Sequence, residues 1–268
     1  MTIAEYQKKC FNEYKKSIRY PEHYSFYYGN PINPLVPVET AVNGAMVVGP
    51  YPSARFYNVN GVADVPLYNN DGPFPTENYF DGLRRTEIKT GSELNNYILR
   101  RIGLKMNGCW VTNLVKVFLF KKGHIDRLHQ LGKKDVEENK SKYADYAKRS
   151  ITWLEKEIEI AQPYVVILLG ADVAAPILGI SEEQASVLIN GMAYKHSIGK
   201  FDEMNVICLP HPTSIIRRAK DNDLPERYFD EIAPKAKDEV FRLKKMARHA
   251  MRSHEQPGES VSGVTIEV

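Results

Sequence analysis

Four short apolar runs constrain the fold of this chain more than any other feature. They cover residues 45–49 (AMVVG), 109–117 (CWVTNLVKV), 164–170 (YVVILLG) and 205–209 (NVICL). Nearly continuous hydrophobicity is what a strand buried on both faces needs. Helical spacing of apolar residues occupies 92–102, 141–161 and 171–178. Strands that alternate with helices predict an α/β fold, here a three-layer α/β/α sandwich around a central four-stranded parallel sheet.

The remaining segments are expected to decorate one domain. Residues 3–18 and 225–252 have the patterns of an N-terminal helix and of a long basic helix with Pro234 near its start. Residues 59–76 carry Gly, Asn, Asp and Pro without periodicity and are predicted to form a loop. We expect a single domain over residues 1–252 and a polar, disordered tail over 253–268.

Composition excludes several classes of protein. Hydrophobic residues make up 43% and charged residues 26% of the 268 positions, which is close to the average of soluble globular proteins. No apolar run approaches the ~18–20 residues of a membrane span. The cysteines (Cys10, Cys109 and Cys208) lie far apart. A disulfide framework or a cysteine-built zinc site is therefore not expected. We expect a cytoplasmic or nucleoid-associated location.

The basic residues are unevenly distributed along a chain whose net charge is only +3. Six of them lie between Lys116 and Lys134, against one acid, Asp126. A second cluster, at positions 217, 218 and 220, follows the segment CLPHPTSII. Local basic patches on a nearly neutral protein suit a polyanion bound at one face, although solvated basic loops have the same appearance.

Polar and Gly-Pro segments follow the predicted strands. They are 49–53 (GPYPS), 113–116 (NLVK), 170–172 (GAD) and 210–214 (PHPTS). Ligands of open parallel α/β sheets bind outside the carboxyl ends of the strands. These four segments are therefore predicted to surround the functional site.

The same segments resemble the motifs of the uracil-DNA glycosylase superfamily, in a layout nearest to its thermophile-type families. Those carry a Gly-x-x-Pro loop, a Thr-Asn-x-Val-Lys strand, a helix–strand–helix unit ending in Leu-Gly-x-x-Ala, and a His-Pro loop. The matching text is 49–52 (GPYP), 112–116 (TNLVK), 160–174 (IAQPYVVILLGADVA) and 211–213 (HPT). Each motif is short, but all four occur in the family's order.

The resemblance implies a DNA glycosylase that works on a flipped base. His211 is expected to stabilise the negative charge that builds up on the departing base, and Asn113 to read a pyrimidine edge with its planar amide. The expected substrate-binding residues are Gly49, Pro50, Tyr51, Pro52, Ser53, Tyr57, Phe74 and Thr213. The expected DNA contacts are Lys116, Lys121, Lys122, Arg217 and Arg218. DNA is the expected partner of a monomer that uses no metal or organic cofactor.

The chain departs from the family pattern at the residue that activates water. Many members carry a carboxylate or an Asn in the first motif, where this chain has Pro50 and Tyr51. Four carboxylates in the segment that follows are candidates to replace it, with none favoured: Asp64, Asp71, Glu77 and Asp81. Thermophile-type members also bind an iron–sulfur cluster through four cysteines, and this chain has three.

Uracil is the default substrate. The alternative is a modified pyrimidine, because the long segment between Tyr51 and Gly91 could enlarge the pocket. Two other functions stay open. The first is a nucleic-acid-binding relative that keeps the pocket but has lost catalysis. The second is an unrelated α/β protein for small nucleotides, which no phosphate-cradling Gly-rich loop supports.

Overall fold

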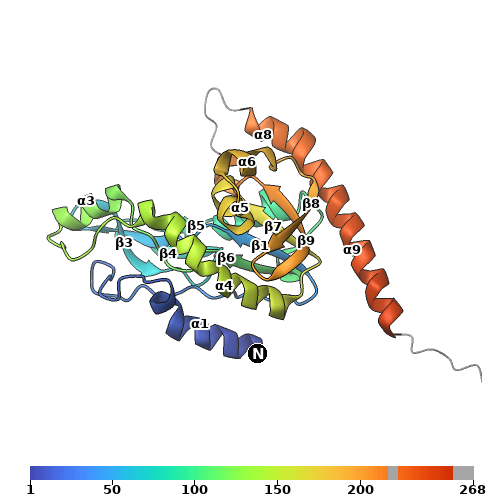
Figure 1. The fold of residues 1–268 in the computed structure, drawn as a ribbon. Helices are drawn as coiled ribbons and strands as arrows, with labels where there is room; N and C mark the ends of the chain where they lie inside the picture. The colour runs from blue at the N-terminus through green and yellow to red at the C-terminus, as the bar shows by residue number, and fades with distance from the viewer. Residues whose placement is uncertain (217–222, 256–268) are drawn as a thin grey trace, which may run out of the picture.

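A parallel sheet forms the centre of the protein in the computed structural model, which describes residues 1–216 and 223–255 (Figure 1). Within those residues the sheet has five strands in the order β6-β1-β7-β9-β8. The bounds of the first four are β1 Ala45–Gly49, β6 Cys109–Asn113, β7 Val165–Leu169 and β9 Phe201–Leu209, all mutually parallel. This confirms the predicted four-stranded parallel sheet. A fifth strand, β8 (Ala193–Ile198), has no apolar run in the sequence and pairs antiparallel with β9 at the edge.

The sheet is covered on both faces because its strands bury alternate side chains in opposite directions. Met46, Trp110 and Leu168 belong to a core cluster that includes residues of the helices α1 (Ile3–Ser17), α4 (Tyr143–Ala161) and α5 (Ala171–Leu178). Val47 and Ile167 belong to a second cluster, with residues of the π-helical turns Leu94–Leu99 and Tyr228–Ile232 and of α9 (Ala233–Glu255). The three-layer α/β/α architecture is therefore as predicted.

The segment predicted to be a loop at 59–76 instead contains most of an antiparallel hairpin. Its strands are β2 (Ala54–Val59) and β3 (Val62–Asn69). Asn60 and Gly61 connect them, with φ of 47° and 82°. An Asn-Gly pair between two strands is a strong signal for a two-residue hairpin turn, because both positions require a positive φ. A second hairpin, β4 (Glu77–Phe80) and β5 (Arg85–Ile88), follows it.

The other elements complete the frame around the strand ends. They are α2 (Thr90–Glu93), α3 (Lys122–Gln130), α6 (Glu182–Val187), α7 (Pro212–Ile216) and α8 (Leu224–Arg227). α3 packs against β3 at the end of the molecule opposite α9 (Figure 1). The predicted long C-terminal helix is present, but a π-helical turn separates α8 from α9. The predicted tail lies almost entirely outside the described residues.

No helix among the described residues has the length and apolar character needed to cross a membrane.

Candidate active site

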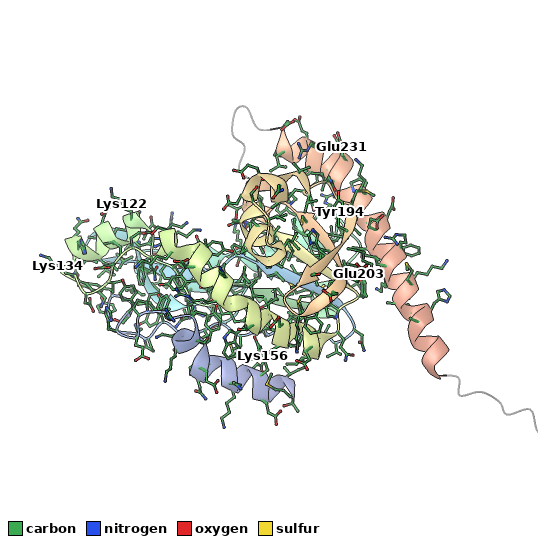
Figure 2. All side chains as sticks on the ribbon, viewed as in Figure 1. Lys122, Lys134, Lys156, Tyr194, Glu203 and Glu231 are labelled. Atoms are coloured by element: carbon green, nitrogen blue, oxygen red, sulfur yellow. The ribbon has the colours of Figure 1, made fainter. Side chains whose placement is uncertain are left out.

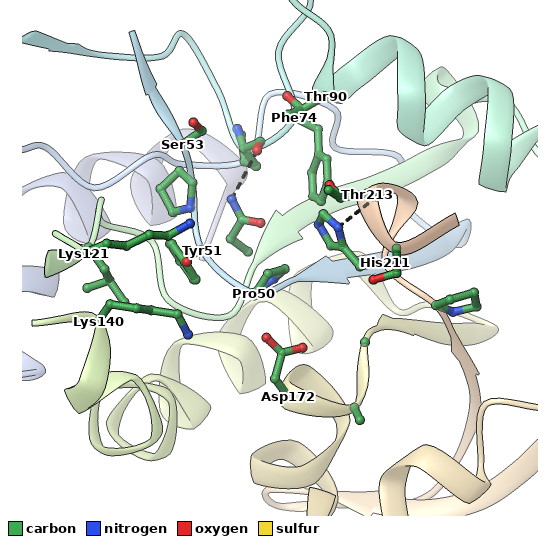
Figure 3. Close-up of a pocket in the computed structure, with 18 of the residues that line it drawn as sticks. Pro50, Tyr51, Ser53, Phe74, Thr90, Lys121, Lys140, Asp172, His211 and Thr213 are labelled. Atoms are coloured by element: carbon green, nitrogen blue, oxygen red, sulfur yellow. Dashed lines mark hydrogen bonds between the residues drawn. The ribbon is translucent and has the colours of Figure 1, made fainter. Parts of the chain in front are cut away.

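A pocket of about 820 Å³ opens at the carboxyl ends of the parallel strands (Figure 3). All four strand-end segments contribute to its lining, as the sequence predicted for a ligand site. The lining includes these residues that were predicted from the sequence: Pro50, Tyr51, Pro52, Ser53, Phe74, Asn113, Lys121, His211 and Thr213.

Asn113 is the last residue of β6 and is almost completely buried. Its Nδ2 donates to the backbone carbonyl of Pro73 at 3.2 Å. Its Oδ1 is also buried and has no hydrogen-bond partner among the described residues. The bond to Pro73 holds the amide in one orientation, so that an unpaired acceptor is left beside the pocket. A buried acceptor without a partner costs free energy unless a ligand supplies the missing donor.

Gly49 supports this arrangement from behind the pocket lining. A side-chain carbon at Gly49 would overlap the ring of Phe74 and lie 2.7 Å from Asn113 Oδ1. Only glycine lets the ring and the amide approach the end of β1 this closely. Phe74 itself is positioned by the loop that follows it, where the Gly91 N–H and the Thr90 hydroxyl both donate to the Pro75 carbonyl.

His211 lies across the pocket, at the turn between β9 and α7. The backbone N–H of Thr213 donates to its Nδ1 at 3.3 Å, the bond drawn in Figure 3. A nitrogen that accepts a hydrogen bond carries no proton, so the neutral ring is protonated on Nε2. This tautomer makes Nε2 a donor, the form that a developing oxyanion requires.

The first-motif loop is tied to the end of β6. The Leu114 N–H donates to the Gly49 carbonyl, and the Val115 N–H donates to the Pro50 carbonyl. Tyr51 lines the pocket, and burial raises the pKa of its hydroxyl to about 12. The ammonium group of Lys140 lies 4.9 Å from the centre of the Tyr51 ring and thus also borders the pocket.

Three aromatic residues, one of them far from the other two in the sequence, form one wall of the pocket. The rings of Phe118 and His124 stack with centroids 5.3 Å apart, and Phe56 lies 5.4 Å from His124. Burial lowers the pKa of His124 to about 4, with help from Lys121 and Arg127. The wall is therefore uncharged at neutral pH, which suits contact with a nucleobase face.

None of the four acids proposed from the sequence lies in the pocket, within the described part of the chain. Asp71 and Glu77 both pair with Arg55, and Asp64 pairs with Arg127 at 3.7 Å. Asp81 accepts turn hydrogen bonds from Arg84, Leu83 and Thr86, which lower its pKa to about 2. All four carboxylates therefore bond to residues outside the pocket lining.

The carboxylate that does line the pocket is Asp172, in the first turn of α5. Its position directly after a buried strand marked it in the sequence, but nothing there distinguished it from a helix-capping acid. Burial raises the pKa of this carboxyl above its usual range.

The placement of two residues argues against their sequence-based assignments. Lys116 is 1% exposed and pairs with Glu157 of α4 at 2.6 Å, so it is inaccessible to DNA. Tyr57 lies outside the pocket lining and packs against Tyr68 and Tyr79 of the hairpins.

The remaining predicted DNA contacts have different placements. Lys121 is exposed at the edge of the pocket, whereas Lys122 points outward from the start of α3 (Figure 2). Arg217 and Arg218 lie outside the described residues.

The cysteines do not fit the ligand set of an iron–sulfur cluster. Cys10 lies on α1, Cys109 on β6 and Cys208 on β9, and all three are buried. Burial raises the pKa of each thiol to about 12, whereas cluster ligands must be thiolates. The described residues also contain no group of three or more His, Cys, Asp or Glu side chains arranged to hold a metal ion.

The family comparison agrees with this geometry. Residues 39–237 match the model of the uracil DNA glycosylase superfamily, and the chain belongs to that superfamily. The matched region spans the whole parallel sheet and every described strand-end segment of the pocket. No curated protein matches the chain.

Proposed function

We propose that this protein is a DNA glycosylase that flips out a pyrimidine, uracil or a modified pyrimidine, and hydrolyses its N-glycosidic bond. The observation that carries the proposal is the fixed amide of Asn113. Its buried Oδ1 has no partner in residues 1–216 and 223–255, and it lies beside a pocket that His211 borders from another strand end. Superfamily membership supports the same class of chemistry.

Asn113 is proposed to select the base. Its Oδ1 accepts a hydrogen bond from the N3–H of a uracil-type edge. Its Nδ2 has a second hydrogen, besides the one given to Pro73, to donate to the neighbouring O4. Cytosine presents an acceptor at N3, opposite an amide that cannot turn without losing the Pro73 bond. The extruded base is proposed to lie against the ring of Phe74, since a flipped base must exchange its stacking partners for protein surface.

His211 is proposed to stabilise the leaving base. As the bond between the sugar C1′ and the base nitrogen breaks, the electron pair passes to the base, whose carbonyl oxygen becomes an oxyanion. The Nε2–H of His211 donates to that oxygen, and it does so without a change of tautomer because the Thr213 N–H already holds Nδ1. Donors arranged in advance for developing charge are a large term in catalysis of this kind.

A base-panel assay tests the proposal. The protein is incubated with single and double strands that carry uracil, modified pyrimidines or the four ordinary bases, and abasic sites are then cleaved with alkali. We expect strand breaks at uracil or at a modified pyrimidine and none at ordinary bases. Asn113→Ala is the matched variant, expected to reduce cleavage of the preferred base while leaving the fold intact.

One observation favours a second candidate, a catalytically silent relative that binds nucleic acid. The first-motif loop provides no carboxylate to the pocket, since its variable positions are Pro50 and Tyr51. DNA binding without strand breaks at any base of the panel would support this candidate and contradict the glycosylase.

A further inference from the structure

Among the described residues that line the pocket, Asp172 supplies the one carboxylate. It is the second residue of α5, and α5 begins directly after β7. β7 lies between β1, whose end carries Pro50, and β9, whose end leads to His211. Asp172 therefore occupies the strand end between the first-motif loop and the histidine. Figure 3 shows its carboxylate pointing into the pocket, toward the side where both of these groups lie.

The backbone at Gly170 brings Asp172 close to the histidine turn. A side-chain carbon at Gly170 would lie 2.5 Å from Asp172 Oδ1 and 3.9 Å from His211 Cβ. Both residues thus flank the same backbone position, and any larger residue at position 170 would displace the carboxylate. The φ of 105° at Gly170 also favours glycine, and the absence of a side chain there leaves room for the Asp172 carboxylate beside the histidine turn.

We propose that Asp172 is the general base that orients and deprotonates the attacking water. This inference rests on the proposed glycosylase function. In the step, the water oxygen bonds to the sugar C1′ while the bond from C1′ to the base nitrogen breaks. The electron pair of that bond leaves with the base, and the proton of the water passes to the carboxylate of Asp172. The products are a sugar hemiacetal and a base anion, which His211 stabilises until the base is protonated.

The surroundings of Asp172 suit a base. Burial raises the pKa of the carboxyl, Lys140 opposes the rise, and the nearby charge of Glu182 adds to it. Tyr51 and Tyr143 also face this carboxylate, but burial and the charge of Asp172 keep both as neutral phenols. A higher pKa gives a stronger base as long as the carboxylate stays ionised at the working pH. The active form is the carboxylate, so activity should be lost as the pH falls through the raised pKa.

An aspartate in the first turn of a helix also stabilises that helix, so the test must separate chemistry from folding. We would measure single-turnover excision of the preferred base from pH 4 to pH 9 for the wild type, Asp172→Asn and Asp172→Ala, with thermal melting and DNA affinity for each. At neutral pH we expect Asp172→Ala to lose about 10²-fold or more of the rate. Asp172→Asn should lose less, because its amide can still orient water. Both should lack the acid limb and should bind DNA at least as tightly, since a negative charge is gone.

Glu182→Gln is the control variant. Glu182 is exposed on α6 and lies outside the pocket lining. Removing its charge should lower the pKa of Asp172 and move the acid limb to lower pH while the plateau rate stays unchanged. This shift assigns the limb to Asp172 rather than to His211.

The outcomes are distinct. A wild type that releases no base from the panel overturns the proposed function, and the inference with it. If the wild type is active, an Asp172→Ala protein with the wild-type rate and pH profile overturns the inference alone. A slow, well-folded Asp172→Ala protein that retains the acid limb assigns Asp172 a structural role and also overturns it.

Discussion

Two neighbouring regions of this protein differ in how completely their buried polar groups are hydrogen-bonded. Behind β6, the carboxylate of Glu157 is fully paired. It accepts from Lys116 Nζ at 2.6 Å, from the Tyr6 hydroxyl at 2.5 Å and from Trp110 Nε1 at 3.3 Å. At the end of the same strand, Asn113 Oδ1 is buried and has no partner in the part of the chain that the structure describes. The comparison separates a structural polar group, whose bonds the protein completes, from an acceptor beside the pocket that a ligand could pair.

The largest expected effect is a loss of stability when the buried ion pair between Lys116 and Glu157 is broken. Lys116→Met should reduce the free energy of unfolding by about 3–5 kcal/mol, because it leaves the buried carboxylate of Glu157 without its counter-charge. Denaturant titration measures the loss. Lys122→Met, at an exposed position, is the control and should change stability by less than ~0.5 kcal/mol.

The double variant Lys116→Met with Glu157→Leu sharpens this prediction. It removes both charges together and should recover most of the lost stability. If the free energy of unfolding of Lys116→Met lay within about 1 kcal/mol of the wild-type value, the buried pair would contribute little, because breaking such a pair usually costs about 3–5 kcal/mol.

In the pocket, a substitution should reduce activity and leave stability nearly unchanged. His211→Ala should reduce single-turnover excision by about 10²–10³-fold, the usual cost of losing one oxyanion donor, with little change in melting temperature. His129→Ala, exposed on α3, is the matched control and should retain the wild-type rate. Full activity in a folded His211→Ala protein would remove the histidine from the proposed mechanism.

Asn113 connects the two regions, since Lys116 Nζ also donates to its backbone carbonyl at 3.0 Å. Asn113→Asp should shift preference toward a cytosine-like edge, and Asn113→Ala should weaken selection. A read edge contact is worth about 1–3 kcal/mol, or roughly one to two orders of magnitude in preference. The base panel measures both variants. Equal losses on every base would mean that Asn113 supports the pocket without reading the base.

The smallest expected effect is on the salt dependence of DNA affinity, through Lys121 at the edge of the pocket. Lys121→Gln should flatten the dependence of log affinity for DNA on log salt by about 0.9 unit, the contribution of one phosphate contact. Lys122 lies outside the pocket lining, so Lys122→Gln should change the slope less. Fluorescence anisotropy at several salt concentrations measures both. Identical slopes for the two variants and the wild type would place Lys121 among solvated surface lysines.

The sequence predicted the sheet better than the surroundings of the site. β1 and β7 are buried along their entire length, so their apolar runs matched the strands to within a residue at each end. The run at 109–117 was longer than β6, because residues after Asn113 stay buried without continuing the strand. The Asn60–Gly61 pair is a local signal for the hairpin β2–β3, in a segment whose composition otherwise predicts a loop.

The errors at the site share a physical cause. Lys116 and Lys121 look alike in the sequence, and only the fold brings Glu157 to the first of them from 41 positions away. Asp172 could be placed at a strand end, but its burial and its approach to the histidine turn depend on contacts between separate segments. Local patterns predict strand ends well, whereas the pairing of polar groups there is decided by tertiary structure.

The inserted hairpins have a consequence for how such a protein can diversify. Asn113, Asp172 and His211 come from the parallel sheet and its immediate continuations, while Phe56 and Phe74 reach the pocket from the insertion between β1 and α2. Lengthening or reshaping that segment would alter the space offered to a base without moving a strand of the parallel sheet. Substrate range can thus change through one segment of the chain while Asp172 and His211 stay in place, whereas the Asn113 amide, which Pro73 of this segment holds, would respond to the same changes.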